Sequence, residues 1–247
     1  WKCQCDMNEA EAKGLLKMDF LGLRNLDIIT DTLRLIKKQK GVSVDINKIP
    51  FVREVFDKIF SLGFTNSIFQ FESPGMKQML KQFKPESFED TILLVAAYRP
   101  GPMQYLEKII NVKHKREPLT YLIPELEPIL KDTYGSIIYQ EQVMQIFQYL
   151  AGYSLGQADL VRRAMSKKKD SVLAKEKDAF IYGDEKRNIK GCKTNGIDEK
   201  KADILFEEMR DFAKYAFNKS HAAAYATVAY QTAWLKHFYP TEYLCSV

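Results

Sequence analysis

Cysteine is scarce in this sequence, and the positions of the few cysteines exclude a disulfide framework. The 247 residues include four: Cys3 and Cys5 form a C-x-C pair, whereas Cys192 and Cys245 stand alone. Folds that are stapled by disulfides carry more cysteines at closer spacing. Structural zinc usually needs C-x₂-C or similar pairs, which this chain lacks. We therefore expect reduced thiols.

The sequence also lacks the motifs that mark several common enzyme classes. It has no G-x-x-x-x-G-K-[ST] loop, no G-x-G-x-x-G segment and no G-x-S-x-G elbow. The P-loop, dinucleotide-binding and α/β-hydrolase classes therefore lose their main support. The three histidines, His114, His221 and His237, have no paired spacing, which argues against a histidine-rich metal hydrolase.

Long apolar runs are missing too. No run approaches the roughly 20 residues of a membrane-spanning helix. The opening WKCQCDMNEAEAKG lacks both the basic and the apolar segment of a signal peptide. We therefore expect a cytoplasmic protein. The opening lacks a start methionine and the chain stops abruptly at YPTEYLCSV, which suggests a piece of a longer protein.

Positive charge is concentrated in one part of the chain. The 37 Lys and Arg residues exceed the 32 Asp and Glu residues by five. From Arg162 to Lys193 there are eleven Lys or Arg and five Asp or Glu, a balance of +6, so the rest of the chain is near −1. A basic run is usually a solvated helix face, but it is also the footprint of a polyanion partner.

Apolar spacing predicts a mainly α fold with a little β structure. Helical periodicity and terminating residues predict helices at residues 25–41, 51–63, 74–83, 87–98, 137–152, 153–169, 198–217 and 220–239. Alternating apolar residues predict one short strand within 14–26 and another within 66–73. Residues 188–196, NIKGCKTNG, predict a flexible, exposed loop.

Several helix starts are marked by their residue types. Pro74 is expected at the first position of its helix. Ser87 with Asp90, and Ser154 with Gln157, have the spacing of capping boxes.

The stretch GLLKMDFLGLRNL places a lysine and an aspartate, Lys17 and Asp19, inside an apolar run. In a strand, residues two apart face the same way, so both side chains could line one surface. That arrangement suits a metal-binding carboxylate beside a phosphate-binding cation. A buried ion pair explains the same residues equally well. A metal site would also need further ligands.

Two other clusters are polar and basic. The segments YQEQVM and ADLVRRAMSKKK are expected to share a surface that contains Gln140, Glu141, Arg162, Arg163, Lys167 and Lys168. The segment FNKSH is expected at a helix N-terminus, where free N–H groups and the helix dipole favour an anion. The candidate residues there are Asn218, Lys219, Ser220 and His221.

Each cluster also has a simpler explanation. A basic helix is more often solvated than ligand-binding, Ser220 could be only an N-cap, and His221 could pack on Tyr225 one turn later. Arg99, in the stiff turn RPGP, could be an ordinary surface residue. Taken together, however, a carboxylate with a lysine, a double-arginine helix and a cationic helix N-terminus are the parts that polyphosphate chemistry needs.

The motifs resemble one family in order along nearly the whole chain. KMDFLGL, IFQFESPGM, RPGP, DTYG, YQEQVM, AGYSLGQADLVRRAMSKKK, FNKSHAAAYA and YQTAWLKHFYP are similar to those of bacterial DNA polymerase III α subunits, the family C replicative polymerases. The resemblance implies a palm-derived segment at residues 1–25 and a helical fingers domain at 26–247. Two departures are Ala216, where glycine is usual, and the extra loop 188–196.

The resemblance further implies a catalytic role for Asp19, as one of three palm aspartates that bind two Mg²⁺ ions. The other two come from an upstream P-D-x-D motif, and this sequence has no aspartates two apart. We therefore expect this fragment alone to be inactive and not to hold the ions. In the intact enzyme, the partners would be primer–template DNA, a deoxynucleoside triphosphate (dNTP), the remaining domains and replicase subunits such as the sliding clamp.

By the same resemblance, residue roles can be assigned. The expected nucleotide-binding residues are Lys17, Arg162, Arg163, Lys167, Lys168, Lys219, Ser220 and His221, and the expected DNA-binding residues are Arg99, Gln140 and Lys169. The alternative is a stand-alone helical nucleic-acid-binding module without catalysis, whose affinity would depend steeply on salt. A protein-interaction scaffold with a solvated basic face is a third reading.

Overall fold

The prediction of a mainly α fold is confirmed by a computed structural model, which describes residues 4–16, 18, 20, 22–166, 170–213 and 215–247. Its α-helices are α1 (Met7–Ala12), α2 (Arg24–Lys40), α3 (Arg53–Val55), α4 (Pro74–Phe83), α5 (Phe88–Ala97), α6 (Leu106–Lys113), α7 (Glu127–Leu130), α8 (Gln140–Ala151), α9 (Leu155–Ser166), α10 (Asp170–Tyr182), α11 (Glu199–Ala213), α12 (Lys219–Phe238) and α13 (Pro240–Ser246). A π-helical turn, η1 (Phe56–Phe60), continues α3. Short 3₁₀ turns are η2 (Pro102–Tyr105), η3 (Pro124–Leu126), η4 (Lys131–Thr133) and η5 (Glu185–Arg187).

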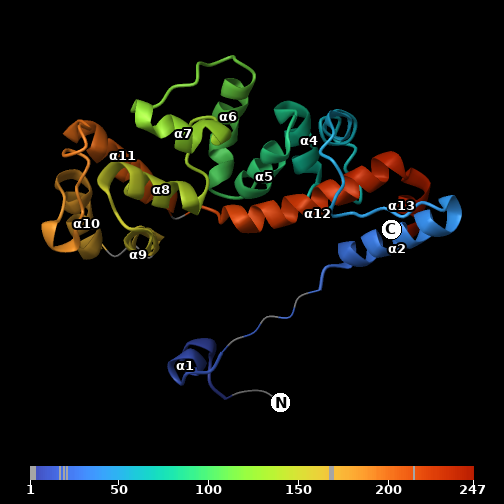
Figure 1. Ribbon diagram of the computed structural model, residues 1–247, viewed down its shortest axis with the longest axis horizontal. Coiled ribbons are helices and arrows are strands. Elements are labelled where there is room, and N and C mark those ends of the chain that lie inside the picture. The colour runs from blue at the N-terminus through green and yellow to red at the C-terminus, as the bar shows by residue number, and fades with distance from the viewer. Residues whose placement is uncertain (1–3, 17, 19, 21, 167–169, 214) are drawn as a thin grey trace.

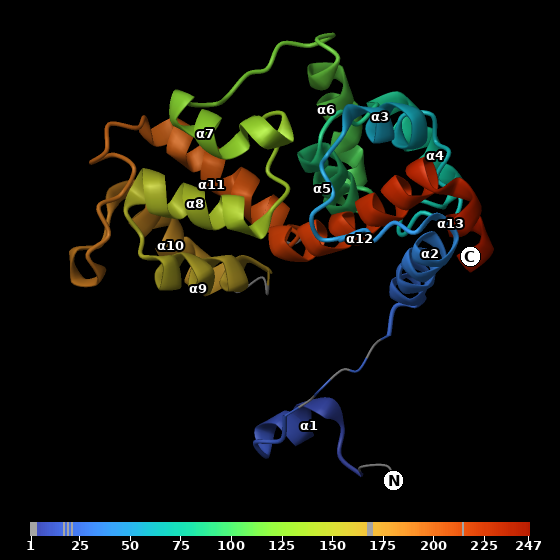
Figure 2. The ribbon, with the colours of Figure 1, turned by 45° about the vertical axis from the view of Figure 1, so that its right-hand side comes forward.

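The long helix α12 organises the molecule. Helices α7 to α11 gather at its N-terminal end, and α2, α4 and α13 gather toward its C-terminal end (Figure 1). Helix α1 stands apart from all of them in each view (Figure 2). No helix in the described part of the chain is long and apolar enough to cross a membrane.

The first of two large hydrophobic cores is built from neighbouring segments of the chain. It extends from Ile123 to Ala213 and takes its side chains from α7 to α11 and their connections. Phe147 lies at its centre, with ring centroids 5.0 Å from both Tyr153 and Phe180. We call this the contiguous core.

The second large core brings together segments that are distant in sequence. It combines residues 55–110, Ile138, Tyr139 and the middle of α12 from Ala222 to Ala233. Tyr230 of α12 joins its parts, since its hydroxyl accepts the Val52 N–H at 2.8 Å and donates to the Pro50 carbonyl at 2.9 Å. We call this the assembled core. A smaller cluster packs α2 against the end of α12 and α13.

The helix starts follow the capping residues. Pro74 is the first residue of α4 after the N-cap Ser73. Ser87 caps α5 by accepting the Asp90 N–H, although the Asp90 carboxylate turns back to the Glu86 N–H. Ser154 and Gln157 form a reciprocal capping box before α9. Local side-chain hydrogen bonds therefore fix these boundaries.

The prediction of a strand within 66–73 is wrong. Ser67 and Gln70 both have positive φ, at 64° and 66°, and the segment forms two successive turns in which the Ile68 N–H donates to Thr65 and the Phe71 N–H to Ile68. Ile68, Phe69 and Phe71 are all buried. The described residues place no strand beside this segment, and turns satisfy its backbone instead.

The strand expected within 14–26 is also absent from the described residues of that segment. Residues 15, 16, 18, 20, 22 and 23 belong to no strand, and α2 begins at Arg24. The described β structure is limited to two isolated bridges, Tyr139 with Phe217 and Asp184 with Ile189.

The segment 188–196 is largely exposed, as expected, but three of its nine residues are buried and its backbone is bonded to neighbouring segments. Ile189 and Cys192 are buried, and the Gly191 and Cys192 N–H groups donate to carbonyls of Ala151 and Phe180. A Cβ at Gly191 would lie 2.3 Å from the Gly183 nitrogen. The close approach of these backbones therefore requires glycine.

Candidate functional site

Some of the expected site residues cannot be placed. Lys17, Asp19, Lys167, Lys168 and Lys169 lie outside the described residues. Their assignments therefore stay predictions. Arg162, Arg163, Lys219, Ser220, His221, Arg99 and Gln140 are described, and the structure shows what surrounds each of them.

Arg162 and Arg163 share one carboxylate on α9. Nη2 of Arg162 lies 2.6 Å from Oδ1 of Asp159, and Nη2 of Arg163 lies 2.8 Å from Oδ2. The two arginines lower the pKa of Asp159, mainly through the Arg162 hydrogen bond. The Arg162 side chain is only 15% exposed, whereas that of Arg163 is 64% exposed. Arg163 is therefore the more accessible of the two cations.

The first turn of α12 is already occupied by an internal anion. Asn218, rather than Ser220, is the N-cap, and its side chain accepts the His221 N–H at 2.7 Å. The Lys219 N–H donates to both carboxylate oxygens of Glu141, at 3.1 and 2.9 Å. The expected attraction of this helix end for an anion is therefore met by Glu141.

The side chains in the first turn of α12 differ in their contacts and in their exposure to solvent. Lys219 Nζ pairs with Glu89 Oε2 at 3.0 Å and lies 5.4 Å from the Tyr139 ring centroid. Ser220 is exposed. His221 is also exposed, although its ring packs at a tilt against the Tyr225 ring, with centroids 4.3 Å apart.

An aromatic row extends along α12 from this turn. The His221 ring lies between Phe217, at 5.4 Å, and Tyr225, and Tyr225 packs on Phe69 at 5.1 Å. Positions 221 and 225 are four residues apart on α12 and so share one helix face, whereas Phe217 lies just before the helix. The pairing of His221 with Tyr225 is as expected, but an exposed histidine shows that it is not a core pair.

Arg99 and Gln140 have their polar groups engaged inside the protein. Arg99 donates to the carbonyls of Ala96 and Tyr215, and its guanidinium carbon lies 4.5 Å from the Phe217 ring centroid. Burial lowers the pKa of Arg99. Gln140 Nε2 donates to the Ala216 carbonyl at 3.1 Å. Both side chains thus support the segment before α12.

Ala216, at the position where the resemblance leads us to expect glycine, shows no backbone strain. It is not among the described residues with positive φ, and its N–H donates to the Phe212 carbonyl at 2.8 Å. A conformation with negative φ is open to alanine as well as to glycine.

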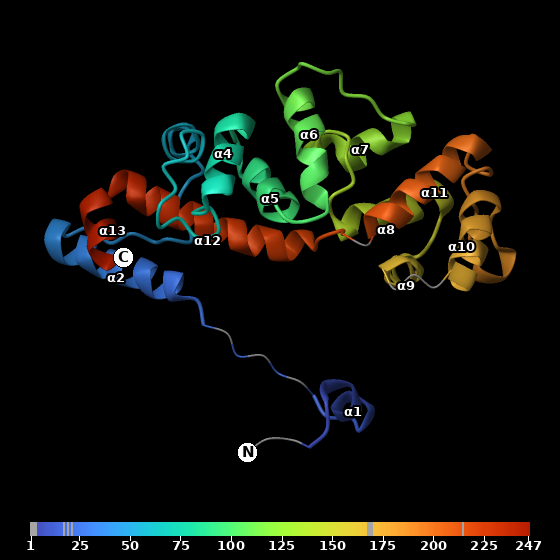
Figure 3. The same ribbon diagram turned by 180° about the vertical axis from the view of Figure 1, so that it is seen from behind.

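Helices α9 and α12 both lie along the side of the molecule that faces α1 in Figure 3. Helix α9 contributes to the contiguous core and α12 to the assembled core. The two cores are joined where the segment before α8 meets the segment before α12. There the Phe217 N–H donates to Ile138 and the Gln140 N–H to Phe217, at 3.0 and 2.9 Å. This junction sets the position of one cluster relative to the other.

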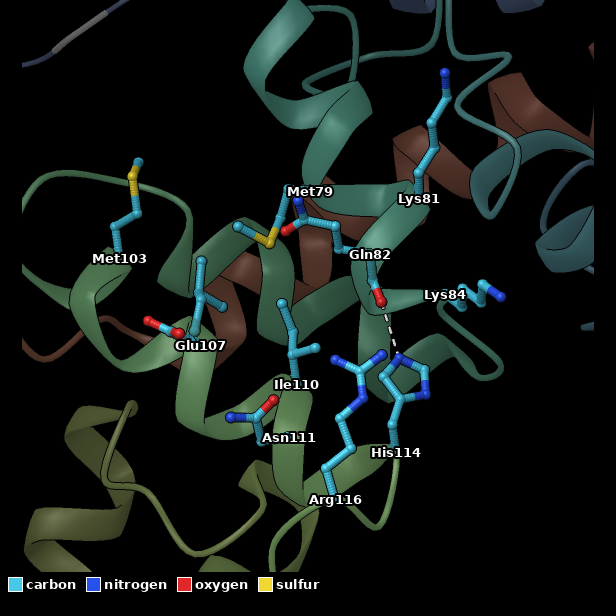
Figure 4. A pocket seen from close by; sticks show the side chains of 11 residues that line it. Met79, Lys81, Gln82, Lys84, Met103, Glu107, Ile110, Asn111, His114 and Arg116 are labelled. Atoms are coloured by element: carbon cyan, nitrogen blue, oxygen red, sulfur yellow. Dashed lines mark hydrogen bonds between the residues drawn. The ribbon is translucent and has the colours of Figure 1, made fainter.

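A hollow of about 790 Å³ lies elsewhere, between α4 and α6 (Figure 4). Its basic residues lie at the C-terminal ends of the two helices: Lys81 is in the last turn of α4, Lys84 is the C-cap of α4, and Arg116 follows α6. His114 Nε2 lies 2.8 Å from the Gln82 carbonyl. Cations stabilise helix C-termini, so these residues are accounted for without a ligand.

The described part of the chain offers no metal site of its own. It contains no group of three or more His, Cys, Asp or Glu side chains that could hold an ion.

Comparison with known proteins identifies the family. The profile of the bacterial DNA polymerase III alpha subunit finger domain matches residues 25–188. The chain belongs to this family. It is 47% identical to DNA polymerase III subunit alpha of Pseudomonas aeruginosa and 44% identical to that of Thermus aquaticus, with 99% of the chain covered in each case. A Staphylococcus aureus relative of the same name is 46% identical over 99% of the chain.

The chain spans about a fifth of the length of these relatives, namely 21%, 20% and 22% respectively. The resemblance seen in the motifs is therefore confirmed, and the chain corresponds to a fragment of the relatives.

Sequence reasoning missed the internal partners of the site. Asp159 could have been found, because it precedes Arg162 and Arg163 by three and four residues, the spacing of helical ion pairs. Glu141 lies 78 residues from Lys219 along the chain. No local spacing connects those two residues.

Proposed function

We propose that this chain supplies the fingers of a DNA-directed DNA polymerase and binds the triphosphate of an incoming dNTP beside primer–template DNA. The supporting observations are the finger-domain profile over residues 25–188 and the relatives that align with 99% of the chain. The domain assignment, a palm-derived segment at 1–25 followed by fingers at 26–247, belongs to the same proposal.

In this proposal Arg163 and Arg162 bind phosphate oxygens, with Lys17, Lys167 and Lys168 extending the cationic surface. A planar guanidinium can engage two phosphate oxygens at once. The charge that develops on the leaving pyrophosphate is then stabilised by fixed cations. For Arg163 to bind phosphate, its ion pair with Asp159 must break. Because this ion pair is exposed to solvent, breaking it costs little free energy.

The other end of the nucleotide is assigned to the start of α12. His221 is exposed within the aromatic row and is proposed to face the sugar and base, with Lys219 and Ser220 beside it. Arg99, Gln140 and Lys169 are proposed to serve DNA binding. For Arg99 and Gln140 the observed contacts support an indirect role, in which they hold the segment that precedes α12.

Catalysis is proposed to depend on parts beyond this fragment. Mg²⁺ supplies charge neutralisation in phosphoryl transfer when it is bound. Asp19 is its proposed ligand here, and one carboxylate is too few. We therefore propose that this chain alone does not extend a primer. In the cell, the complete enzyme would act with replicase subunits, including a sliding clamp.

The experiment is Arg163→Ala in a complete polymerase that contains this chain. We expect roughly a 10²-fold loss in kcat/KM for dNTP in single-nucleotide incorporation, the scale for removing one transition-state donor. Arg34→Ala is the matched control, because Arg34 is also exposed and also pairs with an aspartate one helical turn away, Asp31. Equal kinetics for the two variants would remove Arg163 from the site.

A further inference from the structure

Glu141 lies on the first turn of α8, and three hydrogen bonds connect it to the start of α12. Its two carboxylate oxygens accept the Lys219 N–H, and Oε1 also accepts from Asn218 Nδ2 at 3.0 Å. A carboxylate can accept several donors at once. Glu141 therefore joins a helix of the contiguous core to a helix of the assembled core.

The effect of Glu141 continues through Asn218 into α12. The Asn218 amide donates to Glu141 at one end and accepts the His221 N–H at the other. An asparagine amide has one donor end and one acceptor end. The bond to Glu141 consequently fixes the orientation in which Asn218 caps the helix that carries His221.

The backbone next to Glu141 is held as well. The adjacent residue, Gln140, donates its N–H to Phe217, and Phe217 donates to Ile138. Glu141 thus completes a junction in which the start of α8 and the start of α12 are bonded through both backbone and side chains.

The negative charge of Glu141 also decides where phosphate can bind. A helix N-terminus attracts an anion, but here a carboxylate occupies the Lys219 N–H. A triphosphate at that point would meet like charge. The guanidinium groups on α9 remain the alternative cationic contact, and Arg163 is the exposed one.

We propose that Glu141 is a positioning residue for nucleotide binding. It holds the first turn of α12, with His221, in register with the arginines of α9, and it keeps the triphosphate off the α12 N-terminus. This inference rests on the proposed function for its role in nucleotide binding, but the junction itself can be tested without it.

The first test uses hydrogen exchange on the 247-residue chain. Glu141→Gln keeps the size of the side chain but removes its charge and one acceptor oxygen. We expect the Lys219 and His221 amides to exchange roughly tenfold faster. This factor corresponds to a loss of about 1.4 kcal/mol in the free energy of opening the local hydrogen bonds. The amide of Phe147, inside α8, should keep its rate.

Glu107→Gln is the control, since Glu107 is likewise a carboxylate on the first turn of a helix, α6, although it is exposed where Glu141 is half-buried. It should leave the α12 amides unchanged. Unchanged exchange at Lys219 and His221 in Glu141→Gln would overturn the proposal.

The second test measures dNTP kinetics of Glu141→Gln in the complete polymerase. Misplacement of α12 should raise KM for dNTP roughly tenfold with little change in kcat, the pattern of lost ground-state binding. A variant that merely misfolds in part loses kcat at normal KM, and that result would overturn the role in nucleotide binding. If instead Arg163→Ala has normal kinetics while Glu141→Gln shows the exchange effect and a raised KM, the arginine assignment fails and the Glu141 proposal stands.

Discussion

The two large cores of this chain are similar in composition but differ in how the chain builds them. The contiguous core uses helices that follow one another between Ile123 and Ala213. The assembled core closes only when the middle of α12 returns to residues 55–110. Ordering a long intervening chain costs entropy before distant contacts compensate it. The contiguous core is thus the part whose packing depends most on local sequence.

The largest expected effect comes from removing a central ring in either core. Phe147 and Phe71 are fully buried in the contiguous and assembled cores respectively. Each change to alanine should lower the free energy of unfolding by about 3–5 kcal/mol, because it removes apolar contacts and leaves a cavity. Urea denaturation measures this loss.

The same pair of variants tests whether the cores are separate units. Hydrogen exchange in Phe147→Ala should rise in α8, α10 and α11 while α5 and α12 keep their protection. Phe71→Ala should show the reverse. A uniform rise in both variants would mean that the cores unfold together.

A smaller effect is expected at Gln142, which supports the link between the cores. Its Oε1 accepts the Ile138 and Tyr139 N–H groups, and its Nε2 donates to Ile129 and Thr133. Gln142→Ala should cost about 2–3 kcal/mol of unfolding free energy, because it leaves buried polar groups unpaired.

The matched control for that change is Gln145→Ala, on an exposed position of the same helix. Its effect should stay within about 0.5 kcal/mol. Thermal or urea unfolding that gave the two variants equal stability would refute a special role for Gln142.

The smallest expected effect is the pH dependence from Asp159. Because its pKa is lowered in the folded chain, the unfolded state binds the proton more readily. The stabilisation is therefore complete above the ordinary aspartate pKa and disappears as the pH falls through the lowered value. Comparing urea unfolding of the native chain with Asp159→Asn between pH 6 and pH 3 should show a difference of a few tenths of a kcal/mol that fades in acid. A difference that grew in acid would contradict the sign.

Local sequence was sufficient for much of the helical structure. Ser154 with Gln157, and Pro74 after Ser73, set helix starts through groups within a few residues, so the caps could be read directly. The pairing of Arg162 and Arg163 with Asp159 was not predicted, although its spacing of three and four residues is local. The family, too, was visible in the order of the motifs.

Tertiary structure decided the features that depend on distant partners. The segment 66–73 has the alternation of a strand, but it forms turns, and the described part of the chain places no strand beside it. The segment 188–196 resembles a free loop, yet the backbones of Ala151 and Phe180 bind it. Glu141 meets Lys219 across 78 residues. Residue types and short spacings determine helices and caps, because those interactions are local. A partner that is distant in sequence, as Glu141 is from Lys219, is decided only when the chain folds back on itself.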